Sequence, residues 1–201
     1  MSLNKKGRVS KKENILESAK ILFSEKGYDA TSMDEIALQT GVPKSLIYYH
    51  FKNKEELLQA IVDRFFLEYQ QLLREGWNKE NDSMERYFDF WDTNSAFLRI
   101  ILVESLKKTN GNISVFNVVK LLLQFESEVS GNKDLIEYDK SHSRWVAEFF
   151  TNIVPCLFFV CYADDWCNHF GVDKKDLQQD FFTAYGLTHS EYHNHLQKAD
   201  E

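Results

Sequence analysis

Signatures of helix starts recur along this chain, and they constrain the fold more than any other feature of the sequence. Each is a Ser, Asn or Asp followed three residues later by an acidic residue, the spacing at which side chains satisfy free backbone N–H groups in a first helical turn. The signatures lie at 10–13, 32–35, 53–56, 82–85 and 173–176. Apolar residues follow at spacings of three and four, the period of one helix face. The sequence therefore predicts an all-α fold, and no alternating pattern is long enough for a β-strand.

The expected helices are long, because the 201 residues include only two prolines and eight glycines. Glycines and polar clusters divide the chain into helices at about 10–26, 33–40, 43–50, 53–75, 113–129 and 141–170, with a last helix running past 185. The region from 82 to 108 is expected to hold two helices kinked near Thr93 and Asn94. Pro155 is expected to bend the helix at 141–170, since proline removes an internal hydrogen bond.

Basic residues are concentrated at the N-terminal end of an acidic chain. The formal net charge is −7. Residues 1–54 carry ten Lys/Arg and six Asp/Glu, a net charge of +4, whereas residues 55–201 carry fourteen and twenty-five, a net charge of −11. A polyanion is attracted to the first segment and repelled by the second. Binding to nucleic acid is therefore expected only from the N-terminal quarter of the chain.

Residues 31–51 have the layout of a helix-turn-helix, in which two short helices are joined by a turn that contains glycine. Ile36, Val42 and Ile47 are spaced to pack the two helices on each other, and Gly41 allows the positive backbone angle of a tight turn. The outer side of the second helix, from Lys44 onward, is rich in side chains that bind phosphates and base edges. The motif therefore indicates DNA binding.

A three-helix bundle without a DNA partner is the alternative interpretation. In that case Tyr48, Tyr49 and His50 form a half-buried aromatic cluster. Consecutive side chains on a helix point about 100° apart, so three in a row cannot all face one core. At least one of them meets solvent or a partner. Together with the basic surroundings, this favours the DNA-binding interpretation.

A wider set of positions resembles the N-terminal domain of TetR-family repressors. The matching residues, within about 9–65, are Phe23, Gly27-Tyr28, Ala30-Thr31, Ile36-Ala37, Gly41-Val42, Tyr48-Tyr49-His50-Phe51, Lys52-Asn53-Lys54 and Leu57-Leu58. The resemblance implies a TetR-type helix-turn-helix DNA-binding domain at 9–69, with its motif at 32–51, and a larger helical ligand-binding and dimerisation domain at 70–201. It implies a transcriptional regulator, a repressor, that a small hydrophobic or aromatic inducer releases from a pseudo-palindromic operator in double-stranded DNA. The alternative is a helical ligand-binding or scaffold protein of the same fold without operator binding.

The resemblance also implies roles for nine residues, which are Thr31, Ser32, Lys44, Ser45, Leu46, Tyr48, Tyr49, His50 and Lys54. Those at 44–46 would enter the major groove, and those at 48–50 would bind phosphates or bases. Lys54 would bind a phosphate beside a helix N-terminus, and the pair at 31–32 would meet the DNA backbone. Pro43 departs from the small hydroxyl residue that is common there in the family, which removes one potential phosphate contact.

A basic arm precedes the first helix and is expected to steer association with DNA, unless it is simply solvated. It contains Lys5, Lys6, Arg8, Lys11 and Lys12.

The acidic body is expected to dimerise and to bind an effector, two functions that the resemblance implies. Apolar residues between 149 and 162 surround their helix, so it must be buried on all sides, either in a homodimer made by the last two long helices or in the core of one chain. Aromatic residues of the middle helices form the candidate effector pocket, with ordinary core packing as the alternative. These residues are Phe88, Trp91, Phe116, Trp145 and Phe149.

Other functional classes have little support in the sequence. There is no nucleophile elbow, phosphate-binding glycine loop or pair of carboxylates with a third group, so no enzyme, cofactor or metal site is predicted. Metal binding stays undecided only for the chain end, where His189, His193 and His195 include an i, i+4 pair. Three cysteines in one helical stretch indicate reduced thiols in a cytoplasmic protein. The apolar run at 149–163 is shorter than the ~20 residues of a bilayer span, so no membrane partner is expected.

Overall fold

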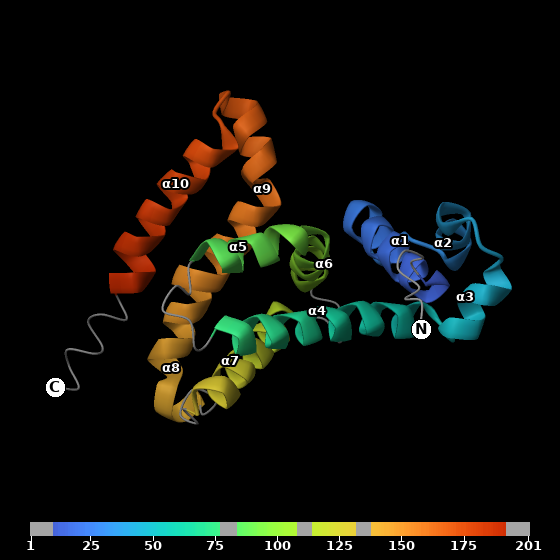
Figure 1. The fold of residues 1–201 in the computed structure, drawn as a ribbon, viewed down its shortest axis with the longest axis horizontal. Helices are drawn as coiled ribbons and strands as arrows, with labels where there is room; N and C mark the ends of the chain where they lie inside the picture. Colours follow the sequence, from blue (N-terminus) through green and yellow to red (C-terminus); the bar gives the residue numbers. More distant parts are fainter. Residues whose placement is uncertain (1–9, 77–83, 108–113, 132–137, 192–201) are drawn as a thin grey trace, which may run out of the picture.

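The computed structural model describes residues 10–76, 84–107, 114–131 and 138–191, and within these ranges all regular structure is helical. Figure 1 shows the arrangement. The elements are α1 (Lys11–Lys26), α2 (Met33–Thr40), α3 (Lys44–His50), α4 (Lys54–Gly76), α5 (Met84–Thr93), α6 (Ser95–Leu106), α7 (Val115–Ser130), α8 (Tyr138–Ala147), η2 (Glu148–Ile153), α9 (Val154–Phe170), α10 (Lys174–Tyr185) and η3 (Gly186–Ser190). The predicted all-α fold is confirmed, as is the break at Asn94, which separates α5 from α6.

The first three helices form a small head around one apolar centre. Ser10 caps α1 as predicted, accepting a hydrogen bond from the Glu13 N–H at 3.1 Å. Ile15 and Phe23 of α1 are buried against Ile36 of α2. Burial of such side chains contributes about 2 kcal/mol each, which is enough to fix three short helices that would not be stable alone.

α4 belongs to both the head and the rest of the molecule, as Figure 1 shows. It packs on α1 near its start and on α6 and α7 farther along. Phe65 of α4 stacks on Phe97 of α6 with ring centroids 4.2 Å apart, and both rings are buried. The predicted domain boundary at 69/70 falls inside this continuous helix. The division into two domains therefore stays a prediction.

One continuous helical rod runs from Tyr138 to Phe170, as predicted for 141–170. Its middle segment, η2, has the wider turns of a π-helix and ends just before Pro155. Proline cannot donate the usual backbone hydrogen bond, and a wide turn directly before it accommodates this loss. The sequence predicted the irregularity but described it as a bend at the proline.

α9 and α10 form an antiparallel arm that projects from the body in Figure 1. Gly171, with φ of 66°, turns the chain between them. Between the two helices lies an apolar groove of about 800 Å³. Phe158 and Tyr162 on α9 are 45% and 51% exposed, so the expectation that this helix is buried on all sides is wrong for a single chain. Among the described residues, none covers this face of the arm.

The segment His142–Phe170 is long and apolar enough to cross a membrane, judged by length and composition alone. The same helix packs on α6 and α10, and 44% of its most apolar stretch is buried inside the protein. Core helices of globular proteins have the same properties, so this finding is weak evidence for a membrane span.

Candidate nucleic-acid interface

The turn between α2 and α3 is fixed at both helix ends. Ser32 and Glu35 form the predicted capping box, since the Ser32 hydroxyl accepts from the Glu35 N–H and the Glu35 carboxylate accepts from the Ser32 N–H. Hydrogen bonds from Lys26 and then Ser32 lower the pKa of Glu35 to about 2. Gly41 ends α2 with φ of 64°, a conformation that favours glycine. The orientation of α3 is therefore built into the local sequence.

α3 turns one side to the core and the other to solvent. Ile47 is fully buried, whereas Tyr49 is 81% exposed. The predicted contacts in this helix fall into an exposed group, Lys44, Ser45, Tyr48 and Tyr49, and a half-buried group, Leu46 and His50. The exposed group includes a cation, a hydroxyl and two phenols, all of which bind phosphate oxygens or base edges. α3 thus presents a polar and aromatic surface outward.

Lys44 has a carboxylate partner on the neighbouring helix. Its Nζ lies 2.7 Å from Oδ1 of Asp34, and the hydrogen bond to that carboxylate raises the pKa of Lys44. Both side chains are exposed, and such surface ion pairs contribute roughly 0–1 kcal/mol. A phosphate could therefore displace Asp34 from Lys44 at small cost.

The structure separates Thr31 from Ser32, which the resemblance implied would both meet the DNA backbone. Thr31 is buried, and its hydroxyl lies 2.9 Å from the Gly27 carbonyl oxygen, to which it donates. Its side chain is therefore unavailable to DNA, and we correct its predicted contact to a structural role at the end of α1. Ser32 is exposed, although its hydroxyl caps α2.

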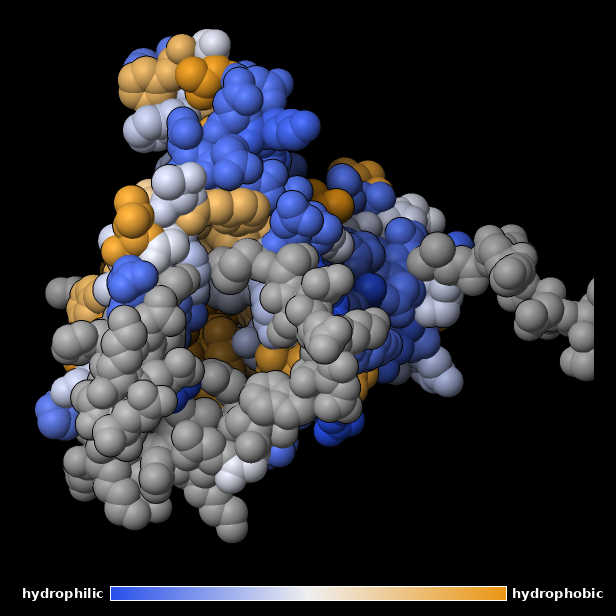
Figure 2. Space-filling view, turned by 60° about the vertical axis from the view of Figure 1, so that its left-hand side comes forward, coloured by the Kyte–Doolittle hydropathy of each residue, from blue (hydrophilic) through white to orange (hydrophobic). Residues whose placement is uncertain are grey.

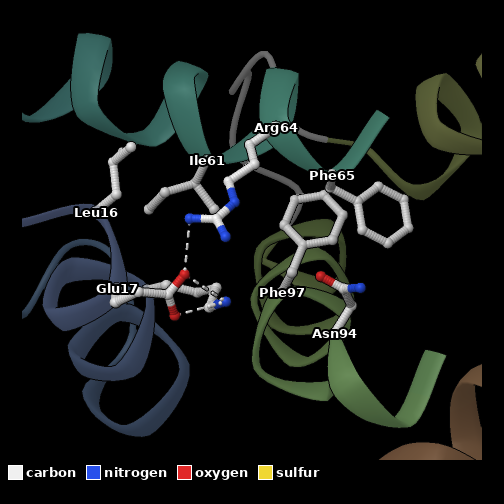
Figure 3. Close-up of a pocket in the computed structure, with 8 residues that line it drawn as sticks. Leu16, Glu17, Ile61, Arg64, Phe65, Asn94 and Phe97 are labelled. Atoms are coloured by element: carbon white, nitrogen blue, oxygen red, sulfur yellow. Dashed lines mark hydrogen bonds and ion pairs between the residues drawn. The ribbon is translucent and has the colours of Figure 1, made fainter. Parts of the chain in front are cut away.

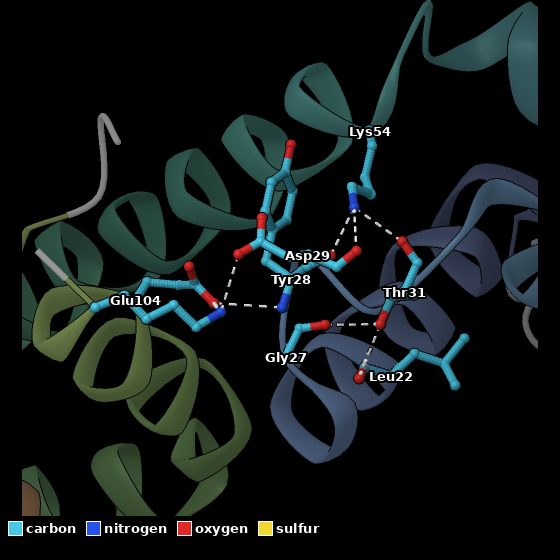
Figure 4. A network of polar contacts seen from close by, with 8 residues as sticks. Leu22, Gly27, Tyr28, Asp29, Thr31, Lys54 and Glu104 are labelled. Atoms are coloured by element: carbon cyan, nitrogen blue, oxygen red, sulfur yellow. Dashed lines mark hydrogen bonds and ion pairs between the residues drawn. The ribbon is translucent and has the colours of Figure 1, made fainter. Parts of the chain in front are cut away.

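Lys54 holds the loop that follows α1. Its ammonium donates to the backbone carbonyls of Tyr28, Asp29 and Thr31 at 2.6, 3.3 and 2.9 Å, as Figure 4 shows. It also lies 4.3 Å from the centre of the Tyr28 ring, within range of a cation–π contact. These bonds use all three ammonium hydrogens. The structure thus gives Lys54 an internal role that the resemblance, which implied a phosphate contact, did not suggest.

The same loop is attached to the body through α6. Glu104 accepts a hydrogen bond from the Tyr28 N–H at 3.3 Å, and Lys107 bridges Glu104 and Asp29 at 2.7 and 3.2 Å (Figure 4). Burial raises the pKa of Tyr28, with a further contribution from Glu55. Sequence reasoning missed Glu104 and Lys107, because these residues lie more than 70 positions from the loop and no spacing signal links them to it.

A second junction joins α1 to α4 on another side of the head. Arg64 of α4 forms ion pairs with Glu13, with Glu17 at 3.0 Å and with Glu68 at 2.8 Å. Figure 3 shows Arg64 reaching toward Glu17 beside a cavity of about 10 Å³, with Phe97 of α6 on its other wall. A cavity of this size holds about one water molecule, so it is a packing gap at the junction and not an effector site.

The five predicted effector residues fall into separate groups. Phe88 is buried among Phe159, Phe181 and Phe182, so it is part of the contact between α5 and the arm. Phe116 of α7 is 65% exposed and lies 5.3 Å from the Phe149 ring.

Trp145 is half-buried, and Trp91 is buried with its indole N–H unpartnered among the described residues. Figure 2 shows a hollow with a hydrophobic floor below the projecting arm. The ring contacts that the structure describes do not link Phe88 to Phe116 or Phe149.

The sequence of the head is similar to that of known proteins. Residues 15–61, from within α1 to the first part of α4, match the family of bacterial regulatory proteins called tetR. Relatives include the biofilm operon icaADBC HTH-type negative transcriptional regulator IcaR of Staphylococcus aureus (strain Newman), 28% identical over 149 residues, which are 71% of this chain and 77% of the relative. The head of this chain is therefore similar to that of TetR-family regulators. The IcaR of Staphylococcus epidermidis is similar to this chain to the same extent.

Solved structures of TetR-family regulators share the fold of this chain. A transcriptional regulator from Aquifex aeolicus VF5 is 22% identical, with a TM-score of 0.56 and coverage of 89% of this chain and 99% of that one. The TetR-family regulator PfmR from Thermus thermophilus is 19% identical, with a TM-score of 0.54 and coverage of 90% and 96%. At these identities the likeness establishes the architecture alone.

Replacing Lys54 by Ala is expected to destabilise the head, because three carbonyls lose their donor at a partly buried site. The free energy of unfolding should fall by about 1–3 kcal/mol. Lys52→Ala is the matched control: Lys52 is exposed, and its loss should change stability by less than about 0.5 kcal/mol. Urea unfolding of both variants measures the difference, and equal stabilities would contradict the structural role of Lys54.

Proposed function

We propose that this protein is a TetR-family repressor that binds a pseudo-palindromic DNA operator as a homodimer and is released by a small hydrophobic or aromatic effector. The observation that carries the proposal is the exposed flank of α3, where Lys44, Tyr48 and Tyr49 face away from the core on the basic end of an acidic chain. The relative IcaR is named a negative transcriptional regulator, which supports repression.

The geometry of the head supports major-groove binding by α3. The helix is seven residues long and starts with Lys44 and Ser45, so its N-terminal residues are the ones free to approach base edges. Leu46 and His50 flank this surface and are half-buried. The acidic body would be repelled by the duplex, which keeps α3 and its neighbours as the contacting surface.

Lys44→Ala is expected to weaken binding to DNA duplexes selected from a random library by roughly tenfold or more, since one contact to a base or phosphate is worth about 1–3 kcal/mol. The slope of log affinity against log salt should also become shallower by up to about two units, because a dimer has two copies of the lysine. Fluorescence polarisation at several salt concentrations measures both quantities.

The matched control is Lys120→Ala, which removes an exposed lysine of α7 from the acidic body. It should leave DNA affinity within about twofold, because surface charges far from the duplex are screened. If the folded wild-type protein binds none of the DNA duplexes at low salt, the proposed DNA binding is contradicted. The alternative is then a helical ligand-binding or scaffold protein without operator binding.

The uncovered face of the arm supports a homodimer through α9 and α10. Phe158, Tyr162, Trp166 and Phe170 follow one another at four-residue spacing along α9 and are 45–58% exposed. Such a row is the ridge that packs into the groove of a facing helix. Isolated large apolar residues are common on monomers, but a continuous aromatic row beside an 800 Å³ groove indicates an interface.

Trp166→Glu is expected to convert the protein from dimer to monomer at micromolar concentration, because a charge would be buried at the centre of the interface. Sedimentation equilibrium should show half the wild-type mass, with unchanged helicity by circular dichroism. Leu38→Glu, which alters an 84% exposed residue of α2 instead, should leave the protein dimeric. A dimeric Trp166→Glu variant would place the interface elsewhere.

The exposed Phe116 beside Phe149, with half-buried Trp145, supports an effector that is apolar or aromatic. A panel of aromatic compounds is tested for binding to the protein. A compound that acts as an inducer must lower the affinity of the protein for operator DNA. Because coupling between two binding sites is reciprocal, DNA must then lower the affinity for the compound by the same factor. Paired titrations measure both factors. Phe149→Ala should reduce compound binding, whereas Leu67→Ala at an exposed position of α4 should not. Binding that leaves operator affinity unchanged would contradict induction.

A further inference from the structure

A group of buried polar side chains lies between the long helical rod and the end of α10, and neither DNA binding nor the effector pocket uses it. Glu148 is 4% exposed and His189 is 5% exposed. Glu148 is the first residue of the π-helical segment η2, and His189 lies in the π-helical segment η3. These two segments pack on each other. π-helical turns are rare in proteins, and those that occur are often found at functional sites. Buried ionisable groups also cost free energy unless they are paired. Both features meet in this group of side chains.

The Thr151 hydroxyl contacts the His189 ring from the rod. It lies 2.7 Å from the Ala147 carbonyl oxygen and 2.9 Å from Nδ1 of His189. The direction of the second hydrogen bond depends on which ring nitrogen carries a hydrogen. When both ring nitrogens are protonated, Nδ1 donates to the hydroxyl oxygen.

The second ring nitrogen faces a carboxylate. Nε2 of His189 lies 3.5 Å from Oε2 of Glu148, which also accepts from Nδ2 of Asn152 at 2.9 Å. The amide orientation of Asn152 follows from its other end, where Oδ1 accepts from the Tyr185 hydroxyl at 3.0 Å. A carboxylate this close to a buried imidazole favours the protonated, cationic form of the ring.

The surrounding groups favour the ion-pair form of this contact. Arg144 lies on the same rod with its Nε 3.8 Å from Oε1 of Glu148, and its positive charge stabilises the carboxylate. Among the described residues, Cys156 of α9 and Tyr185 of α10 contact Asn152 beside the pair, and burial raises the pKa of Cys156 to about 12, so it stays a thiol.

α6 and α7 contact the same rod at other residues. Arg99 of α6 donates to the Cys161 carbonyl, and Phe116 of α7 packs on the Phe149 ring.

We propose that Glu148 and His189 form a proton-binding latch that holds η3, the segment after α10, against the long rod and is released at alkaline pH. In the unfolded chain an imidazole has a pKa of about 6.5, so above that pH the unfolded state has lost a proton that the folded pair retains. The folded state then binds more protons than the unfolded state, and stability falls as pH rises. Below this range both states hold the proton and the latch contributes fully. The proposal does not depend on DNA binding.

The first test compares the pH dependence of unfolding in the full-length wild type and three variants at one protein concentration. Between pH 7 and pH 9 the wild-type unfolding constant should rise by up to about tenfold per pH unit more than that of His189→Gln or Glu148→Gln. Glutamine keeps a hydrogen-bonding group at each position without the titrating proton. His142→Gln is the matched control at an exposed position of α8 and should keep the wild-type dependence. Wild-type dependence in His189→Gln overturns the proposal.

A second measurement needs no destabilising variant. Nitrogen-15 NMR of the wild-type imidazoles separates protonated from neutral rings. The His189 ring is expected to remain protonated on both nitrogens well above pH 6.5, the ordinary pKa of an imidazole. If the ring loses its second proton at or below that pH, the buried pair does not hold a proton and the latch is excluded.

Discussion

A single ammonium group joins three segments of the head at the start of the helix that connects it to the body. Lys54 starts α4, and its three hydrogen bonds go to carbonyls of the loop between α1 and α2. α1, α2 and the start of α4 are thereby joined at one point, and α3 is held between them. Because α4 continues into the body without a break, the orientation of α3 depends on this junction and on the helices that pack against α4.

The sequence predicted the secondary structure well, because its signals are local. Capping residues such as Ser10 and Ser32, together with Gly41 and Gly171, act within one helical turn and marked the ends of α1, α2 and the long rod correctly. The π-helical turns could not be foreseen in the same way. Their extra residue per turn depends on how Pro155 and the end of α10 pack in three dimensions, and no periodicity in the sequence encodes that.

The exposed part of the candidate site was predictable for the same reason. Ile47 faces the core, and helical geometry then places Lys44, Tyr48 and Tyr49 on other sides of α3. The roles of Thr31 and Lys54 were not predictable, because burial and carbonyl acceptors are tertiary features. A lysine near a helix N-terminus suggests a phosphate contact from sequence alone, and only the loop carbonyls show that its charge is used inside the head.

The two junctions of the head explain how an event in the body could reach α3. Glu104 of α6 accepts the Tyr28 N–H, and Arg64 of α4 gathers carboxylates of α1. α6 also touches α7 and α9, so it connects these two helices to the loop that Lys54 holds. A shift of α6 must either carry this loop along or leave the Tyr28 N–H without its acceptor, which costs about 1–3 kcal/mol. Joint movement of α6 and the head avoids that cost, so these contacts give mechanical coupling between the body and α3 a physical basis in this chain.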